Sequence, residues 1–492
     1  MGGGERVLAE RFVREAACAV TYCVLAATTA CSTQSPYAPA HFNDHLVWAN
    51  QSGNPAFLLP PNEDWWSALD DPVLSGLIES ALASSPSLAL ADAHLAEARA
   101  TLGLKTSLSH PQISVNGSGG RARVQSASGA STTQVGNSIT GGPTFAWEID
   151  LFGRLRDAQD AAASRLDARN ADAQSARLLV SSQVAGALVS LRACRFGLGV
   201  KRDDIASRER DLALTRRRVA LGFAPPVDES RAISGLEDAR ASLISQDESC
   251  VKDRDALVAL SGLTATEIDA RITLTGFATD QQKEPGYPRV PQVALALPAT
   301  VLSRHPAVIA AEREAAATYA EIGVARANRL PVINLTSALT GNWISASGST
   351  LSFLGWSLIS GIGAPLFDAG GGAASVDAAT ARYLAALASL HSTLRNTAQD
   401  IEDALAEQSH ASERLAAAIR ARDAARATLD ATESQWRAGA VNLFQLEDTR
   451  RQREAADQTA IDAARASIQA WIDIVRASGN AAAFVTTPMY QE

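Results

Sequence analysis

The sequence has few of the residues that mark several common classes of protein. Of its 492 residues only two are Met, five are Cys and 5% are aromatic. Lys and Arg number 44 against 53 Asp and Glu, so the formal net charge is −9, which argues against a nucleic-acid-binding protein because such proteins need a basic face. After the N-terminal segment no run of about 18 apolar residues occurs. The chain is therefore not predicted to be a polytopic helical membrane protein.

Residue patterns for catalysis and metal binding are also lacking. Gly370-Gly371-Gly372 is not followed by Lys and Ser or Thr, so it is not a phosphate-binding loop. His41 and His45 lie in a segment rich in Ser, Pro and Asn, and no Cys/His cluster has the spacing of a zinc site. We expect no enzymatic activity, no catalytic residues, no cofactor and no metal.

The N-terminus, residues 1–30, is predicted to be an export signal. Arginines precede an apolar stretch at 16–27, and small residues follow it directly before Cys31. This arrangement resembles a bacterial lipobox, in which the Cys becomes the acylated first residue, although Thr28 stands where the pattern has Leu or Val. The alternative is an apolar N-terminal helix that is retained. Residues 31–64 are expected to form an extended tether.

The rest of the sequence consists of two similar halves. Residues 86–113 align without a gap on 306–333 at an offset of 220, and Gly222 matches Gly439 at an offset of 217. Because separated blocks keep nearly one offset, we predict an internal duplication. The predicted segments are a first repeat at 65–262, a linker at 263–297, a second repeat at 298–480 and a C-terminal tail at 481–492.

Each repeat is predicted to contain two β-strands. After a helix that stops at Pro111, residues 112–124 alternate with a period of two, and 138–151 form a second strand beyond a polar loop. The second repeat has the corresponding strands at 332–345 and 351–367. Each strand has at least about ten residues, which is the length that crosses a bilayer.

Long helical hairpins are predicted to follow the strands. Residues 154–221 and 372–438 contain no proline, which costs about 3 kcal/mol inside a helix, so each is expected to be one helix about 100 Å long. Gly-containing turns lead into return helices at 228–260 and 441–478. Their Ala-rich seams suit coiled-coil packing. The fold class is thus mainly α, with a small β part.

Four strands cannot close a barrel, and an open sheet edge cannot face lipid because its backbone groups would be unsatisfied. The ordered segments resemble the TolC-like outer-membrane efflux protein family, and more closely its NodT-type lipoprotein branch. The resemblance extends from residue 65 to about 481. It is carried by WWSALDDPVLSGLIESAL (65–82), WEIDLFGRLR (147–156), IGVARANRLPVINL (322–335), APLFDAGG (364–371) and WRAGAVNLFQLEDTR (436–450).

The resemblance implies a homotrimer with a 12-stranded β-barrel and a long α-helical barrel. Such a protein is lipid-anchored in the bacterial outer membrane, extends into the periplasm and serves as the passive exit duct of a tripartite efflux system for small molecules. Its partners are a periplasmic adaptor (membrane fusion protein), a proton-driven inner-membrane transporter and outer-membrane lipid. Two alternatives remain open at this point: a protein-secretion duct beside an ATP-driven transporter, and a coiled-coil envelope scaffold without a pore.

The resemblance also implies functional residues at the two hairpin tips. A pair of acidic residues, three apart, lines the family's tunnel mouth; Asp448 matches the second and Gln445 occupies the first position, while Glu447 and Asp228 are further candidates. A solvated helix face is the alternative for Glu447, and plain helix caps are the alternative for the tips. The expected adaptor contacts are Val219, Ala220, Leu221, Gly222, Phe223, Arg437, Ala438, Gly439 and Ala440.

Two cysteines are predicted to form a disulfide. Cys194 precedes Gly222 by 28 positions and Cys250 follows it by 28, so they lie at similar heights on opposite arms of one hairpin. In the oxidising periplasm such a bond would contribute about 3–4 kcal/mol in the chain-entropy model. The alternative is two buried free thiols that face different ways.

Overall fold

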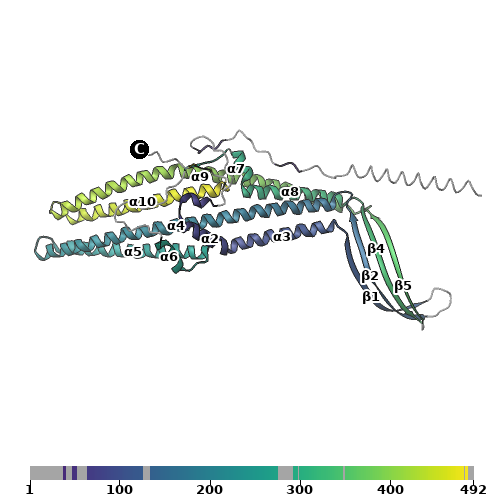
Figure 1. Ribbon diagram of the computed structural model, residues 1–492. Coiled ribbons are helices and arrows are strands. Elements are labelled where there is room, and N and C mark those ends of the chain that lie inside the picture. The colour runs from purple at the N-terminus through teal and green to yellow at the C-terminus, as the bar shows by residue number, and fades with distance from the viewer. Residues whose placement is uncertain are drawn as a thin grey trace, which may run out of the picture. The chain divides into compact units, whose positions relative to one another are not determined.

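The structure, a computed structural model, describes residues 37–39, 47–51, 64–125, 133–274, 292–296, 298–346, 349–480 and 483–485 (Figure 1). The predicted export signal and Cys31 lie outside these residues. The chain divides into two compact units. The first comprises His94–Asn170 and Ala310–His391 with residues 37–39, and the second contains the remaining described residues.

The first unit contains a four-stranded antiparallel sheet in the order β1-β2-β4-β5. Its strands are β1 (Gln112–Gln125), β2 (Thr133–Ile149), β4 (Val332–Ala346) and β5 (Ser349–Gly363). All four predicted strands are confirmed, with two corrections at their ends. β2 begins before the predicted residue 138, because its first residues pair with the end of β1. β5 ends before the predicted residue 367, where Pro365 has no N–H to donate.

The register gives the sheet one mainly apolar face and one mainly polar face. The polar face also carries the exposed apolar side chains of Ile344, Leu351, Phe353 and Ile359. Successive side chains of a strand point to opposite faces, and directly paired residues share a face. On the polar face the hydroxyls of Ser114 and Thr144 lie 2.7 Å apart, and Thr140 Oγ1 donates to Asn342 Oδ1 at 3.1 Å. The apolar face comprises Ile113, Val115, Ile139, Phe145, Leu335, Leu339, Trp343, Leu354, Trp356, Leu358 and Ile362.

Close backbone approach in the middle of the sheet requires a glycine. A Cβ added to Gly142 would lie 1.9 Å from the carbonyl oxygen of Leu339. Pro143 follows directly and supplies no N–H to the ladder, and the residue pairing between β2 and β4 is interrupted at these two positions. The outer strands β1 and β5 each have one edge with no partner strand among the described residues.

Long helices account for most of the remaining fold. α4 (Arg154–Ala220) and α9 (Gly371–Arg437) have 67 residues each and confirm the predicted long helices. α5 (Pro226–Ser261) and α10 (Leu443–Ala477) are the return helices. α10 begins two residues later than predicted because the Asn442 side chain caps it by accepting from Gln445 N.

Shorter elements complete the chain. They are the 3₁₀ helix η1 (Trp65–Leu69), α2 (Pro72–Ser84), α3 (Pro86–Leu108), α6 (Ala265–Leu274), α7 (Pro298–Arg304), α8 (Pro306–Ala327) and the short strands β3 (Gln292–Ala294) and β6 (Ala483–Val485). α6 lies within the segment predicted as a linker. Its Ile268 and Ile272 are buried in the core of the second unit.

That core is built around two tryptophans. The ring centroids of Trp65 and Trp471 lie 5.6 Å apart, and Trp65 Nε1 donates to Ser181 Oγ at 3.0 Å. Beside them the Asp71 carboxylate caps α2 by accepting from Val73 N and forms a buried ion pair with Arg192. Helices α2, α4 and α10 are thereby joined in one apolar cluster.

None of the described helices is, by itself, long and apolar enough to cross a bilayer. α2 and α3 meet that length and composition only when they are counted together as one bent pair.

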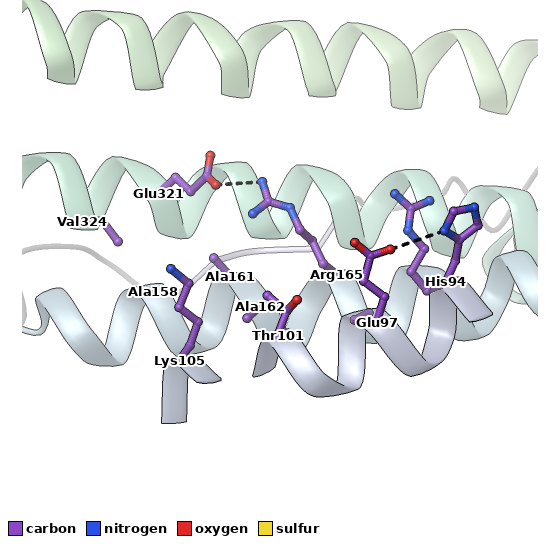
Figure 2. Close-up of a pocket in the computed structure, with 12 residues that line it drawn as sticks. His94, Glu97, Thr101, Lys105, Ala158, Ala161, Ala162, Arg165, Glu321 and Val324 are labelled. Carbon is purple, nitrogen blue, oxygen red and sulfur yellow. Dashed lines mark ion pairs between the residues drawn. The ribbon is translucent and has the colours of Figure 1, made fainter. Parts of the chain in front are cut away.

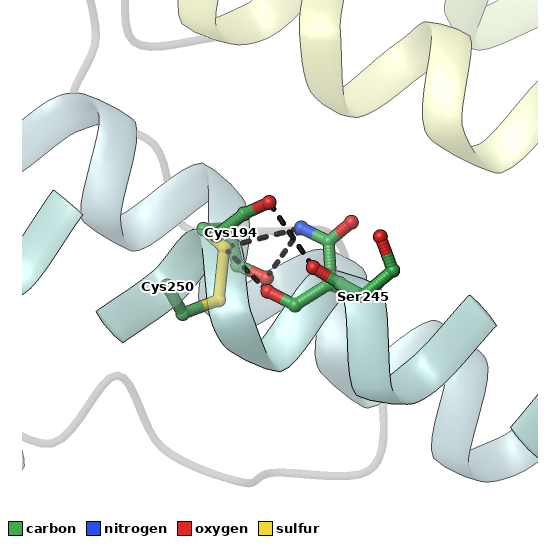
Figure 3. Close-up of a disulfide and its surroundings, with 5 residues drawn as sticks. Cys194, Ser245 and Cys250 are labelled. Atoms are coloured by element: carbon green, nitrogen blue, oxygen red, sulfur yellow. Dashed lines mark hydrogen bonds between the residues drawn. A yellow bond between two sulfur atoms is a disulfide. The ribbon is translucent and has the colours of Figure 1, made fainter. Parts of the chain in front are cut away.

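The α4–α5 hairpin contains a disulfide between Cys194 and Cys250, the pair that equal spacing from Gly222 predicts (Figure 3). Their Cα atoms lie 5.5 Å apart, within the usual range for a disulfide. Gln246 Nε2 donates to Cys194 Sγ at 3.1 Å, and both cysteines are buried. The bond therefore links the two helices inside the apolar core of the second unit.

We predict that peptide mapping of the oxidised protein without reductant recovers the Cys194–Cys250 pair as one crosslinked species. The double variant C194S/C250S should unfold at a lower temperature, since losing the crosslink removes about 3–4 kcal/mol. Thermal unfolding followed by circular dichroism measures this. Two free thiols in the oxidised wild-type protein would contradict the assignment.

Candidate functional site

The two hairpins reverse direction through the same backbone motif. Gly222 and Gly439 have φ values of 77° and 79°, which an L side chain rarely adopts. Gly222 N donates to the Val219 carbonyl at 3.0 Å, and the next amide, of Phe223, donates to Arg218 O at 2.8 Å. The second tip repeats this pair of bonds from Gly439 and Ala440. These are Schellman caps, so the duplicated glycines are explained by the turn that each must make.

Apolar side chains are exposed at the first tip. Leu221 is 70% exposed and Phe223 is 81% exposed. Of the nine predicted tip residues only Val219 is partly buried, and the other eight are exposed. The first tip therefore exposes two large apolar side chains, two positions apart, to water.

Arg218 connects the two tips. Its guanidinium lies 4.7 Å from the centroid of the Trp436 ring and donates to the carbonyls of Trp436 and Arg437 at 3.1 and 3.2 Å. A cation over an indole face and at the C-terminus of a helix is stabilised by both the ring quadrupole and the helix dipole. Around it lies a cavity of about 400 Å³, whose lining includes Phe223, Asp228 and Asn442.

Three of the predicted gate residues have side chains that reach the surface. Asp448 is 47% exposed and accepts from Arg451 at 3.2 Å and from Gln452 at 2.8 Å. Gln445 is exposed in the first turn of α10. Asp228 lies in the first turn of α5, where Arg231 is 3.7 Å away. Asp448 and Gln445 are three positions apart, so they lie on one side of α10.

Glu447 has different surroundings from the other predicted gate residues. Its side chain is only 17% exposed and points into an ion-pair network with Arg208 and Arg450. Position 447 is about 100° from position 448 around a helix, so the two carboxylates face different surroundings. Burial raises the pKa of the Glu447 carboxyl, although Arg208 acts in the opposite direction.

Arg450 is the centre of this network and is 1% exposed. Its guanidinium pairs with Asp211 on α4, with Glu433 on α9 at 3.3 Å and with Glu447 on α10 at 3.1 Å. Burial, aided by the positive charge of Arg208, lowers the pKa of Arg450 to about 10, so it stays protonated at neutral pH. The network thus joins three helices through one buried cation. No pattern in the sequence distinguishes Arg450 from its exposed neighbour Arg451.

The first unit contains a separate cavity of about 490 Å³ between α3, α4 and α8, lined by alanines and by charged side chains (Figure 2). Arg165 pairs there with Glu321 at 2.8 Å, and His94 lies 3.5 Å from Glu97. Within the described ranges no group of three His, Cys, Asp or Glu side chains could hold a metal ion. These charged side chains in the lining of the cavity are therefore paired with each other and are not arranged to bind a metal ion.

The fold thus combines a four-stranded antiparallel sheet with two long helical hairpins. The chain belongs to the outer membrane efflux protein family, whose model matches residues 77–263 and 297–480. The first match begins twelve residues after the start of the predicted repeat at 65–262, and the second lies within one residue of the predicted 298–480. The protein is an outer-membrane component of an efflux system.

Individual proteins agree with the family assignment. Outer membrane protein OprJ of Pseudomonas aeruginosa is 28% identical over 425 residues, covering 85% of this chain and 86% of OprJ. Nodulation protein T of Rhizobium leguminosarum bv. trifolii is 26% identical over 397 residues, covering 79% and 81% of the two chains. The solved structure of the outer-membrane channel OprN superposes with a TM-score of 0.79 at 23% identity, covering 92% of this chain and 99% of that one.

We predict that R450Q destabilises the protein by about 3–5 kcal/mol, because it removes the buried cation that pairs with Asp211. Glu433 and Glu447 also lose this partner but keep Arg437 and Arg208. The adjacent R451Q is the matched control, and its exposed ion pair contributes about 0–1 kcal/mol. Chemical denaturation of both purified variants measures the difference. Equal midpoints for R450Q and R451Q would show that the network does not hold the hairpins together.

Proposed function

We propose that the protein is a homotrimeric, passive exit duct for small molecules in a tripartite efflux system. The two-faced open sheet is the observation that supports this most strongly. Its apolar face suits lipid and its mainly polar face suits a water-filled interior. Among the described strands, β1 and β5 each have one edge without a partner. Pairing β1 of one copy with β5 of the next would satisfy both edges, and three copies would supply twelve strands.

The polar face of the sheet would line the interior of this barrel. Hydroxyl and amide groups such as those of Thr140 and Asn342 are neutral and already hydrogen-bonded to each other. They offer a passing molecule no strong binding site, which suits a duct that must release what enters it. Selection and energy would therefore come from an inner-membrane transporter, and the chain would move solutes down their gradient.

The hairpin tips would bind a periplasmic adaptor. Leu221 and Phe223 provide the apolar anchor, and the Schellman turns hold them in a fixed position on rigid helices. Arg437 and the backbone around Gly439 would form the corresponding contact of the second hairpin. Exposed apolar side chains at the centre of a contact commonly carry most of its binding energy.

A lipid anchor at Cys31 would support the barrel in the outer membrane. A single acyl chain binds a membrane weakly, so the anchor would act together with the inserted strands and not in their place. Residues 31–64 would connect it to the helices as a tether.

Asp448 would form a ring of three carboxylates at the tunnel mouth, with Gln445 one turn away and Asp228 on the other hairpin of each chain. A ring of like charges attracts cations and repels anions at a constriction. Because Glu447 pairs internally with Arg208 and Arg450, the ring would hold one acidic residue of α10 per chain.

Planar-bilayer recording of the purified wild-type protein tests the pore directly. We expect discrete conductance steps with a preference for cations, and D448N should reduce that preference because it removes three charges from the mouth. D430N, an exposed carboxylate elsewhere on α9, is the control and should behave as wild type. Absence of conductance in folded wild-type protein would contradict the proposal and favour a scaffold.

The tip contact is tested by replacing Phe223. We expect F223S to bind the purified periplasmic adaptor of the same organism at least about tenfold more weakly, since it removes an exposed aromatic anchor. I244S, which removes a side chain of similar exposure on α5, should bind as wild type. Biolayer interferometry measures both affinities, and equal binding by F223S and wild type would exclude Phe223 as an anchor.

A further inference from the structure

The four long strands carry almost no charge. Their only charged residues are Arg121 and Arg123 on β1 and Glu148 on β2. Glu148 is paired with Arg154, whose guanidinium donates to it at 2.6 to 2.9 Å. Both arginines of β1 are exposed. The segments 112–147 and 331–367 contain no acidic residue, so the sequence offers them no carboxylate nearby.

The strand register places both arginines on the apolar face. Ile113, Val115, Arg121 and Arg123 are separated by even numbers of residues, so their side chains project from the same side of β1. The arginines lie toward the end of β1 that leads to the β1–β2 connection, whereas Ile113 lies toward the end joined to α3. A side of the sheet that suits lipid therefore carries two cations at one end.

The row that contains Arg121 is polar across all four strands, and beyond it the same face carries Arg123 beside Val135. Across the sheet the Arg121 row reads Arg121, Asn137, Ser345 and Thr350, all polar. The adjacent row toward the helices contains Ile139 and Trp343, an aromatic of the kind found at membrane interfaces. Eight residues separate Ile113 from Arg121, about 26 Å along the strand and about 19 Å across a bilayer at a 45° tilt. Arg123, ten residues from Ile113, would lie about 23 Å away across the bilayer. Because the apolar band of such a barrel is about 25 Å tall, Arg121 and Arg123 would lie near its outer edge, within reach of the headgroups.

A neighbouring copy would not neutralise these charges. In the proposed trimer β1 lies beside β5 of the next chain, and β5 contains no charged residue. Three copies would then bring six unpaired guanidinium groups to one level of the barrel exterior. Guanidinium recognises phosphate through two parallel N–H···O bonds, a charge-assisted pairing that is both strong and geometrically specific.

We propose that Arg121 and Arg123 form a binding site for the phosphate groups of lipid headgroups in the outer leaflet. The site rests on the proposed trimeric, membrane-inserted arrangement, in which the strand connections face outward. Phosphorylated glycolipid fits it, because the acyl chains would lie along Ile113 and Val115 while the phosphates meet the arginines. The site would fix the depth of the barrel in the membrane.

Native mass spectrometry of the purified full-length protein in detergent tests the site. The probes are a bis-phosphorylated lipid A and the same lipid after removal of both phosphates. We expect wild type to retain the phosphorylated form preferentially and R121Q/R123Q to bind it about 10- to 30-fold more weakly. The dephosphorylated lipid should bind both proteins equally. R99Q/R420Q removes two exposed arginines from helices and should match wild type.

Further readouts separate the possible failures. R121Q/R123Q should keep the conductance and the oligomeric mass of wild type. If that variant does not assemble, R121K/R123K replaces it as the test. The lysines keep the charge without the paired N–H groups, so this variant should bind the phosphorylated lipid with intermediate affinity. Equal retention of both lipids by conducting wild-type protein would overturn the site but not the channel. Competition by inorganic phosphate at the same concentration as the lipid would also overturn it. A wild-type protein that neither assembles nor conducts would instead refute the proposed function.

Discussion

Backbone hydrogen bonding at the edges of a four-stranded sheet is the constraint on which the rest of this structure depends. β1 and β5 each have a row of amide and carbonyl groups that no other described strand meets. In water such an edge is tolerable, but in lipid each unsatisfied group costs several kcal/mol. Since the same sheet has an apolar face that suits lipid, its edges need partners. In the proposed trimer a second and third copy of the chain would supply these strands and close the barrel.

The long helical hairpins are also duplicated, one in each repeat. Gly222 and Gly439 produce identical turns, so each repeat contributes one tip of the same shape. The tips differ in their polar contacts. Arg218 of the first hairpin donates to a carbonyl at the end of α9. Arg450 pairs with carboxylates on three helices. Buried ion pairs of this kind contribute little net stability but are costly to break, so they favour one relative arrangement of the two hairpins.

Much of this fold could be predicted from sequence because it depends on local patterns. Period-two alternation located the strands, the absence of proline located α4 and α9, and equal spacing from Gly222 placed Cys194 opposite Cys250. The role of Glu447 could not be predicted, because its partner Arg208 lies 239 positions away and both belong to charged helices. The start of β2 was missed for a related reason: polar residues there extend the strand only because β1 pairs with them.

Amide hydrogen exchange in the four strands of the membrane-embedded protein tests the central claim most directly. If copies of the chain close the sheet, the outward amides of β1 and β5 should exchange as slowly as those of the inner strands β2 and β4. Fast exchange confined to β1 and β5, with slow exchange in β2 and β4, would show that the edges remain open and would contradict the account.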